Sequence, residues 1–137
     1  MVEKKTDAFP KSLPALARAQ QITKDASSVG FDWPEIGPVI NKLGEELSEL
    51  KGAMASGNQA RIRAEMGDLL LSLVNLSRFL NIEAEEALSE AVERFLRRFA
   101  YVETKIQKQG RTLSEATLEE MDAFWEEAKK AEGLKQP

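Results

Sequence analysis

The sequence predicts an all-α protein, an antiparallel helical bundle of about five helices. Apolar residues recur at helical intervals in five segments, and Gly, Pro or Asn separates these segments. No stretch shows the apolar and polar alternation of a strand. A chain of 137 residues is large enough for one core. We therefore expect a flexible tail over residues 1–10 and a single domain over residues 11–137.

The first two helices are predicted from their apolar faces. One runs over about residues 13–27, and the next begins near Pro34, with Asp32 just upstream as a helix-start signal. The expected apolar face of the second helix consists of Ile36, Val39, Ile40, Leu43, Leu47 and Leu50. The other positions of this helix would then carry its acids.

The remaining helices have clear boundary residues. Gly57 suits the end of the second helix and Asn58 the start of the third, which continues to Phe79 or Leu80. A fourth helix over about residues 83–109 stops at Gly110, and its length of roughly 40 Å predicts a partner surface. Thr117 and Glu120 form a capping box for the last helix, with Leu118, Met121, Phe124 and Trp125 expected to face inward.

Two pairs of acids lie at matched distances from Gly57. Glu49 and Glu65 are each eight residues away, and Glu46 and Asp68 are each eleven residues away. Within each pair the spacing is i, i+3, which places both carboxylates on one helix face. A helical hairpin that turns at Gly57 would bring all four carboxylates to one level, where they repel unless they bind a cation. The spacing predicts a metal site.

The alternative for these acids is an ordinary solvated face, because Glu is a good helix former. Asp68 argues against that alternative, since it directly precedes Leu69, Leu70 and Leu71 on a strongly apolar helix. The chain has no His and no Cys, which excludes thiolate sites and the Glu-x-x-His motifs of di-iron bundles. Oxygen ligands alone favour Mg²⁺, or Mn²⁺, and such ions help to bind phosphates.

Basic and aromatic residues supply candidates for the rest of a phosphate-containing substrate. Arg94, Arg97 and Arg98 share one side of the fourth helix, although charge balance against neighbouring acids is an alternative explanation. Lys42 lies one turn before Glu46 and is a further candidate for the phosphate site, with charge balance again as the alternative explanation. Phe31 and Trp33 are candidates for stacking on a nucleobase, or else for packing into the core.

The composition restricts the possible partners. The net charge of −4 offers no basic field for nucleic acid. No apolar run is long enough to span a membrane, and no signal-like segment follows the charged start of the chain. We expect a cytoplasmic protein that binds neither nucleic acid nor membrane.

The acidic motifs resemble those of a known family. The chain reads EExxE at Glu45–Glu49, then fifteen residues, then ExxD at Glu65–Asp68. With these motifs the chain resembles the MazG-type nucleoside triphosphate pyrophosphohydrolases, all-α enzymes of the NTP pyrophosphatase superfamily. The similarity extends over about residues 13–130, including residues 29–34, 74–78 and 97–99.

The resemblance implies roles for individual residues. It implies metal ligation by Glu46, Glu49, Glu65 and Asp68, the same four acids that the spacing selects. Glu45 would join Glu46 and Glu49 as a catalytic residue that orients or deprotonates water, although a surface role is an alternative. Arg94 and Arg97 occupy the region where the family has Asn-x-Lys-Phe-x-x-Arg, and are expected to contact phosphates. Lys42, Asn75 and Trp33 are further substrate-binding candidates.

The function implied is Mg²⁺-dependent hydrolysis of nucleoside triphosphates between the α and β phosphates, which releases nucleoside monophosphate and pyrophosphate and clears unwanted nucleotides. The family also implies a homodimer or homotetramer. Two alternatives remain: a non-catalytic helical module that binds nucleotide or protein, and a specialised relative such as a dUTPase, a dCTPase or a phosphoribosyl-ATP pyrophosphohydrolase.

Overall fold

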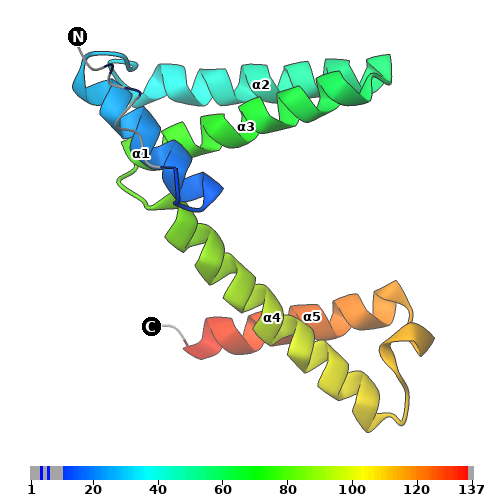
Figure 1. The fold of residues 1–137 in the computed structure, drawn as a ribbon. Coiled ribbons are helices and arrows are strands. Elements are labelled where there is room, and N and C mark those ends of the chain that lie inside the picture. Colours follow the sequence, from blue (N-terminus) through cyan, green and yellow to red (C-terminus); the bar gives the residue numbers. More distant parts are fainter. Residues whose placement is uncertain (1–3, 5, 7–10, 136–137) are drawn as a thin grey trace. The chain divides into compact units, whose positions relative to one another are not determined.

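The computed structural model describes residues 4, 6 and 11–135, and regular structure in this part of the chain is entirely helical (Figure 1). The elements are α1 (Ala15–Ser28), α2 (Ile36–Ser56), α3 (Gln59–Phe79), α4 (Ala84–Lys108), the short 3₁₀ turn η2 (Leu113–Glu115) and α5 (Leu118–Lys135). The predicted all-α class is confirmed. A flexible tail was predicted over residues 1–10. Except for residues 4 and 6, this segment lies outside the described residues. No helix in the described part is long and apolar enough to cross a membrane.

The chain divides into two compact units. The first comprises Met1–Ala87 and contains α1, α2, α3 and the first turn of α4, whereas the second comprises Leu88–Pro137 and contains the rest of α4, η2 and α5. The single domain expected over residues 11–137 stays a prediction. All four motif acids belong to the first unit.

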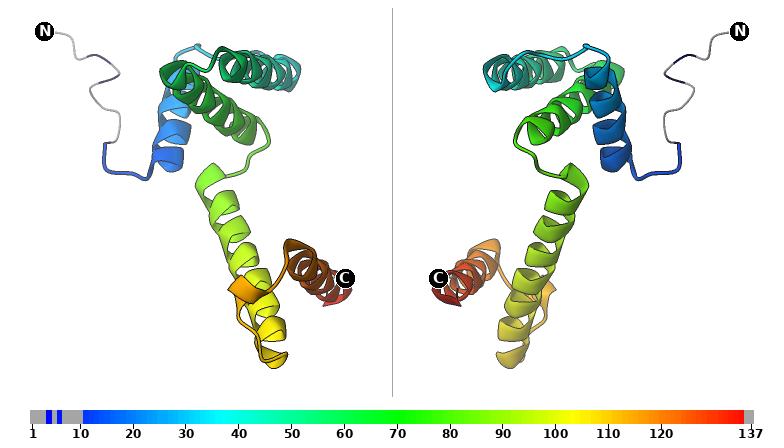
Figure 2. Two further views of the ribbon diagram at one scale, coloured as in Figure 1. Left: turned by 90° about the vertical axis from the view of Figure 1, so that its right-hand side faces the viewer. Right: turned by 90° about the vertical axis from the view of Figure 1, so that its left-hand side faces the viewer.

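The hairpin of α2 and α3 is the centre of the first unit. Gly57 adopts the left-handed conformation with a φ of 71°, which a residue without Cβ tolerates best. The Asn58 side chain then caps α3 by accepting a hydrogen bond of 3.2 Å from the backbone N–H of Arg61. The two helices consequently run antiparallel and lie side by side (Figures 1 and 2). Both predicted boundary residues are confirmed.

The buried face of α2 differs from the predicted one. The residues that α2 buries are Val39, Glu46, Leu50 and Ala53. By contrast, Ile40 is 51% exposed and Leu47 is 44% exposed, so their assignment to the buried face was wrong. The cause is that α2 carries apolar residues on two adjacent faces, and only packing against α3 determines which face is buried. Glu46 therefore lies in the buried stripe and not on the solvated side.

Helix α1 holds the connection between α3 and α4. The Gln20 side chain is 9% exposed and forms hydrogen bonds with two backbone groups of this connection. Its amide nitrogen donates to the carbonyl of Ile82 at 2.8 Å, and its amide oxygen accepts from the N–H of Ala84 at 2.7 Å. A single buried amide thus satisfies two backbone groups that no helix satisfies.

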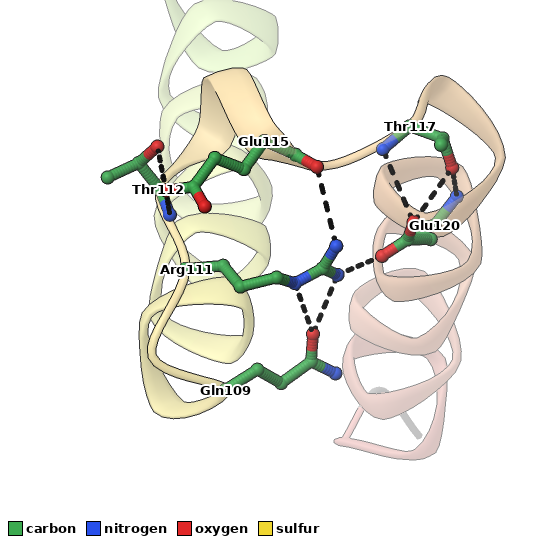
Figure 3. A network of polar contacts seen from close by, with 6 residues as sticks. All are labelled: Gln109, Arg111, Thr112, Glu115, Thr117 and Glu120. Atoms are coloured by element: carbon green, nitrogen blue, oxygen red, sulfur yellow. Dashed lines mark hydrogen bonds and ion pairs between the residues drawn. The ribbon is translucent and has the colours of Figure 1, made fainter.

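In the second unit a polar network joins the end of α4 to the start of α5 (Figure 3). The Arg111 guanidinium contacts the Glu120 carboxylate and donates to the amide oxygen of Gln109 at 2.8 Å. The hydroxyl of Thr117 accepts from the N–H of Glu120 at 3.1 Å, and the Glu120 carboxylate accepts from the backbone N–H of Thr117 at 3.5 Å. The predicted capping box is confirmed.

The apolar packing of this unit lies between α4 and α5. Val102, Ile106 and Ala128 are buried, and the rings of Phe95 and Trp125 lie 5.2 Å apart between centroids. Leu118, which was expected to face inward, is 77% exposed. That expectation was wrong because Leu118 is the first residue of α5 and lies at the rim of an open apolar groove.

The loop between α1 and α2 is tied to the end of α3 by an ion pair. The Arg78 guanidinium donates to both carboxylate oxygens of Asp32, at 2.9 and 3.0 Å, and the two side chains are 11% and 14% exposed. Asp32 was expected to mark the start of α2, but the residue before that helix is Glu35, whose side chain makes no capping bond. The carboxylate of Asp32 is instead drawn to Arg78.

This ion pair predicts a specific dependence of stability on pH. The bonds from Arg78 lower the pKa of Asp32 from 3.8 to about 2, although burial acts in the opposite direction. The ionised pair therefore stabilises the fold above the unfolded-state pKa, and this contribution is lost as the pH falls through about 2. With allowance for solvent screening, Asp32→Asn should lower the free energy of unfolding by about 1 to 2 kcal/mol at pH 7.

Urea denaturation of both proteins, followed by circular dichroism, checks this expectation. The difference between them should shrink toward zero near pH 2. Asp25→Asn is a suitable control, because that carboxylate accepts an exposed bond from Gln21 within α1. A deficit in Asp32→Asn that is equal at both pH values would contradict the assigned role of the pair.

Candidate metal centre

Three of the four motif acids converge between α2 and α3. Oxygen atoms of Glu46 and Glu49 on α2 and of Glu65 on α3 all lie within 4.8 Å of one another. Glu46 is buried, Glu65 is half-buried and Glu49 is exposed, so the cluster runs from the helix interface out to solvent. The turn at Gly57 creates this arrangement, because it places positions equally distant from the turn opposite each other.

Asp68 lies one turn after Glu65 on the same helix and is exposed. It is not part of the close group of three. Its charge nevertheless acts on that group: burial is the main cause that raises the pKa of Glu65, and the charges of Glu49, Asp68 and Glu46 raise it further. Asp68 therefore lies near enough to the cluster for its charge to act on Glu65, but outside the group whose oxygens meet.

Two carboxylate oxygens of the cluster are buried and accept no hydrogen bond from the described residues. Among the described residues, one oxygen of Glu46 and one of Glu65 have no hydrogen-bond partner. A buried acceptor without a partner costs free energy, and a buried charge costs more. A divalent cation among these acids would satisfy both oxygens and remove the repulsion. The donor set consists of carboxylate oxygens alone, so the residues fit a hard ion such as Mg²⁺ or Mn²⁺.

Lys42 supplies the positive charge nearest to Glu46 in the described chain. Its ammonium nitrogen lies 3.2 Å from one Glu46 oxygen and 3.5 Å from Glu45. The contact with Glu46 raises the pKa of Lys42. Glu45 has a side chain that is 63% exposed, and it lies outside the close group of three. Lys42 is therefore at the edge of the acid cluster, where it can also meet an anionic ligand.

Two predicted substrate-binding residues lie elsewhere in the first unit. Asn75 is buried on α3, and its side-chain oxygen accepts from Arg78 at 2.8 Å. Trp33 is half-buried and lines a pocket of about 300 Å³ with Gly30, Phe31 and Asp32. Sequence reasoning did not single out Arg78, which contacts both of these places. The available signal was an arginine three residues after Asn75, near the end of a strongly apolar helix.

Arg94 and Arg97 lie on α4 in the second unit and are exposed. Arg98 differs from them, because it forms an ion pair of 2.8 Å with Glu132 on α5. The Arg98 hydrogen bond is the main cause that lowers the pKa of Glu132, with smaller contributions from the charges of Arg97 and Arg94. Arg98 is thus held within its own unit. The phosphate contacts of Arg94 and Arg97 stay a prediction.

Comparison with known proteins places these features in a family. Residues 38–102, which include all four motif acids, match the model of the MazG nucleotide pyrophosphohydrolase domain. This segment belongs to the MazG family. The MazG match begins at the third residue of α2 and ends inside α4, and so it covers nearly all of the hairpin that carries the acid cluster.

Curated relatives of this chain are longer proteins. The chain is 44% identical over 128 residues to the "Nucleoside triphosphate pyrophosphohydrolase" of Escherichia coli (strain K12). This alignment covers 92% of the chain and 49% of that protein. A Thermotoga maritima protein named "Nucleoside triphosphate pyrophosphohydrolase/pyrophosphatase MazG" is 46% identical over 117 residues, or 85% of the chain and 45% of that protein. The Bacillus subtilis protein YabN, named as uncharacterized, is 41% identical over 92% of the chain and 26% of its own length. The chain spans about half the length of the first two.

The acid cluster predicts how metal and mutation affect stability. Glu65→Gln removes a charge that burial and neighbouring acids disfavour, so the metal-free variant should melt at the same temperature as the wild type or higher. Mg²⁺ at a hundred times its dissociation constant should stabilise the wild type by about 2.7 kcal/mol. The variant should lose most of this gain, because it lacks one ligand.

Thermal melts with EDTA and with MgCl₂ or MnCl₂ provide the measurement. Glu86→Gln on α4, an exposed acid outside the cluster, should respond to metal as the wild type does. An equal metal response in all three proteins would remove Glu65 from the site.

Proposed function

We propose that the chain hydrolyses nucleoside triphosphates between the α and β phosphates, producing nucleoside monophosphate and pyrophosphate. The observation that supports this most strongly is the convergence of Glu46, Glu49 and Glu65, with buried oxygens that have no partner among the described residues, inside the segment that matches the MazG domain. The names of the Escherichia coli and Thermotoga maritima relatives point to the same reaction. Removal of surplus or aberrant nucleotides would be its purpose.

In this proposal Glu46, Glu49 and Glu65 hold Mg²⁺, or Mn²⁺, and Asp68 completes the site. The ion would supply charge to the phosphate oxygens and lower the pKa of a bound water. Attack of water oxygen on phosphorus breaks the bridging bond between the α and β phosphates, and the water proton passes to a basic group of the site. Glu45 and Glu49 have exposed carboxylates that can orient this water.

The remaining substrate contacts divide into two groups. Lys42 is assigned to the phosphates, because its ammonium group already lies 3.2 Å from an acid of the cluster. Arg94 and Arg97 are assigned to the phosphates by their position in the family's basic stretch. Asn75 and Trp33 are assigned to the nucleoside, with Trp33 offering an aromatic surface beside a pocket of about 300 Å³.

Removal of acids tests the reaction. Glu49→Ala and Asp68→Ala should each lower the rate of pyrophosphate release at least about 100-fold, since each removes charge that holds the ion. Circular dichroism should show an unchanged helical content, because both residues are exposed. Glu86→Ala serves as the matched control and should retain activity.

The assay should use a panel of nucleoside triphosphates, with dUTP, dCTP and phosphoribosyl-ATP among them, and Mg²⁺. A strong preference within the panel would identify a specialised relative. Nucleotide binding without pyrophosphate release from any substrate would contradict hydrolysis and favour the non-catalytic module.

A homodimer or homotetramer is also proposed. Helix α2 exposes Ile40, Leu47 and Met54 at seven-residue intervals, and α3 exposes Met66, Leu70 and Leu73. All six side chains are between 44% and 61% exposed. Two apolar stripes on adjacent helices are a surface that a second copy of the same hairpin can cover.

Light scattering measures the assembly directly. The wild type should have at least twice the mass of one chain, and Leu70→Lys should lower that mass because it places a charge in the stripe. Val29→Lys alters an exposed apolar residue outside both stripes and should leave the mass unchanged. A monomeric wild type would contradict the proposal.

A further inference from the structure

The loop between α1 and α2 presents two aromatic rings beside a pocket. Gly30, with a φ of 95°, turns the chain, and the pocket of about 300 Å³ is lined by Gly30, Phe31, Asp32 and Trp33. Phe31 is 81% exposed, which is unusual for a large aromatic residue unless a ligand or partner covers it. Flat rings at a small pocket suit the flat face of a nucleobase. The position of these rings depends on how the loop is held.

Asp32 lies between the two aromatic residues in the sequence, so its contacts restrain the backbone that carries both rings. Both of its carboxylate oxygens accept bonds from Arg78, at 2.9 and 3.0 Å. A two-point contact with a planar guanidinium fixes the orientation of a carboxylate as well as its position. One of these oxygens also accepts from the N–H of Trp33 at 3.0 Å. The backbone of the second aromatic residue is therefore held by the same group.

Arg78 also orients a side chain on its own helix. The nitrogen that contacts Asp32 at 3.0 Å donates to the side-chain oxygen of Asn75 at 2.8 Å. Because the oxygen of this amide is occupied, its NH₂ group is the part that can donate to a ligand. One guanidinium thus holds the aromatic loop, through Asp32, and orients the buried amide of Asn75.

The acid cluster and this clamp share helix α3. Asp68 and Asn75 are seven residues apart, which places them on one face of the helix and about 10 Å apart along its axis. A helix is rigid over such a distance. A clamp at Arg78 therefore keeps the aromatic pocket at a constant separation from the acids, as a substrate with phosphates at one end and a base at the other requires.

We infer that Arg78 is a positioning residue for the nucleoside: through Asp32 and Asn75 it holds the Phe31 and Trp33 pocket in register with the metal-binding acids. This rests on the proposed hydrolysis of nucleoside triphosphates. An ion pair of two largely buried side chains adds little stability over an apolar pair of similar shape. What the pair supplies at this place is geometry.

Arg78→Gln tests the inference in a Trp125→Phe background, where Trp33 is the remaining tryptophan. Acrylamide quenching of Trp33 fluorescence in the ligand-free protein should rise about twofold or more, as the loop is released. The KM for nucleoside triphosphate should rise about tenfold while kcat changes little, because the base is held less well. Affinity for inorganic tripolyphosphate with Mg²⁺ should stay unchanged, since this probe has no base. Arg78→Lys should give an intermediate KM, because ammonium keeps the charge without the two-point contact.

Arg111→Gln is the matched control, since it removes a guanidinium and carboxylate contact in the second unit. It should lower stability without altering Trp33 quenching or KM. Should Arg78→Gln fail to fold, Asp32→Asn breaks the same contact with a side chain of the same size. Unchanged quenching and KM would overturn the inference, and so would loss of tripolyphosphate affinity, which would place Arg78 at the phosphates. A wild type that releases no pyrophosphate would overturn the proposed function, while Trp33 quenching would still decide whether Arg78 holds the loop.

Discussion

The mutual repulsion of the carboxylates of Glu46, Glu49 and Glu65 is the constraint on which the rest of this structure depends. Three acids whose oxygens lie within 4.8 Å of one another do not stay together unless the surrounding fold holds them. Here the close packing of α2 on α3 does so, with Val39 and Leu50 buried on either side of Glu46 along α2. Lys42 offsets part of the charge, and the buried oxygens without partners remain available to a cation.

The hairpin therefore combines a stabilising interface with a destabilising cluster. A buried glutamate in an apolar stripe lowers stability unless it has a partner, so a protein selected for stability alone would place an apolar residue at position 46. The raised pKa of Glu65 has the same origin in burial and neighbouring charge. Such a local conflict is typical of functional sites, and in this chain it falls inside the segment that matches the MazG domain.

A second ion pair extends the influence of α3 beyond the acids. Asp32 and Arg78 connect the loop after α1 to the end of α3, and Asn75 shares the same guanidinium. Along one helix the chain thus carries acids for a metal, an amide and an anchor for an aromatic pocket. In the proposed function this order would correspond to the order of parts in a nucleotide, from phosphate to base. The apolar stripes of α2 and α3 are exposed in the single chain, and in the proposed assembly a second copy would cover them.

The sequence by itself determined the helices, the turn at Gly57 and Asn58, and the meeting of Glu46, Glu49 and Glu65. Each of these follows from local chemistry: helical periodicity, the left-handed conformation of a glycine, a side-chain cap, and equal distances from one turn. Only the tertiary structure decided that Glu46 is buried while Ile40 and Leu47 are exposed, because α2 has two adjacent apolar faces and the packing of α3 selects one. It also decided that Asp32 pairs with Arg78, 46 residues away, where local rules predicted a helix start. Contacts over such separations depend on which faces meet, and no local pattern in the chain encodes that choice.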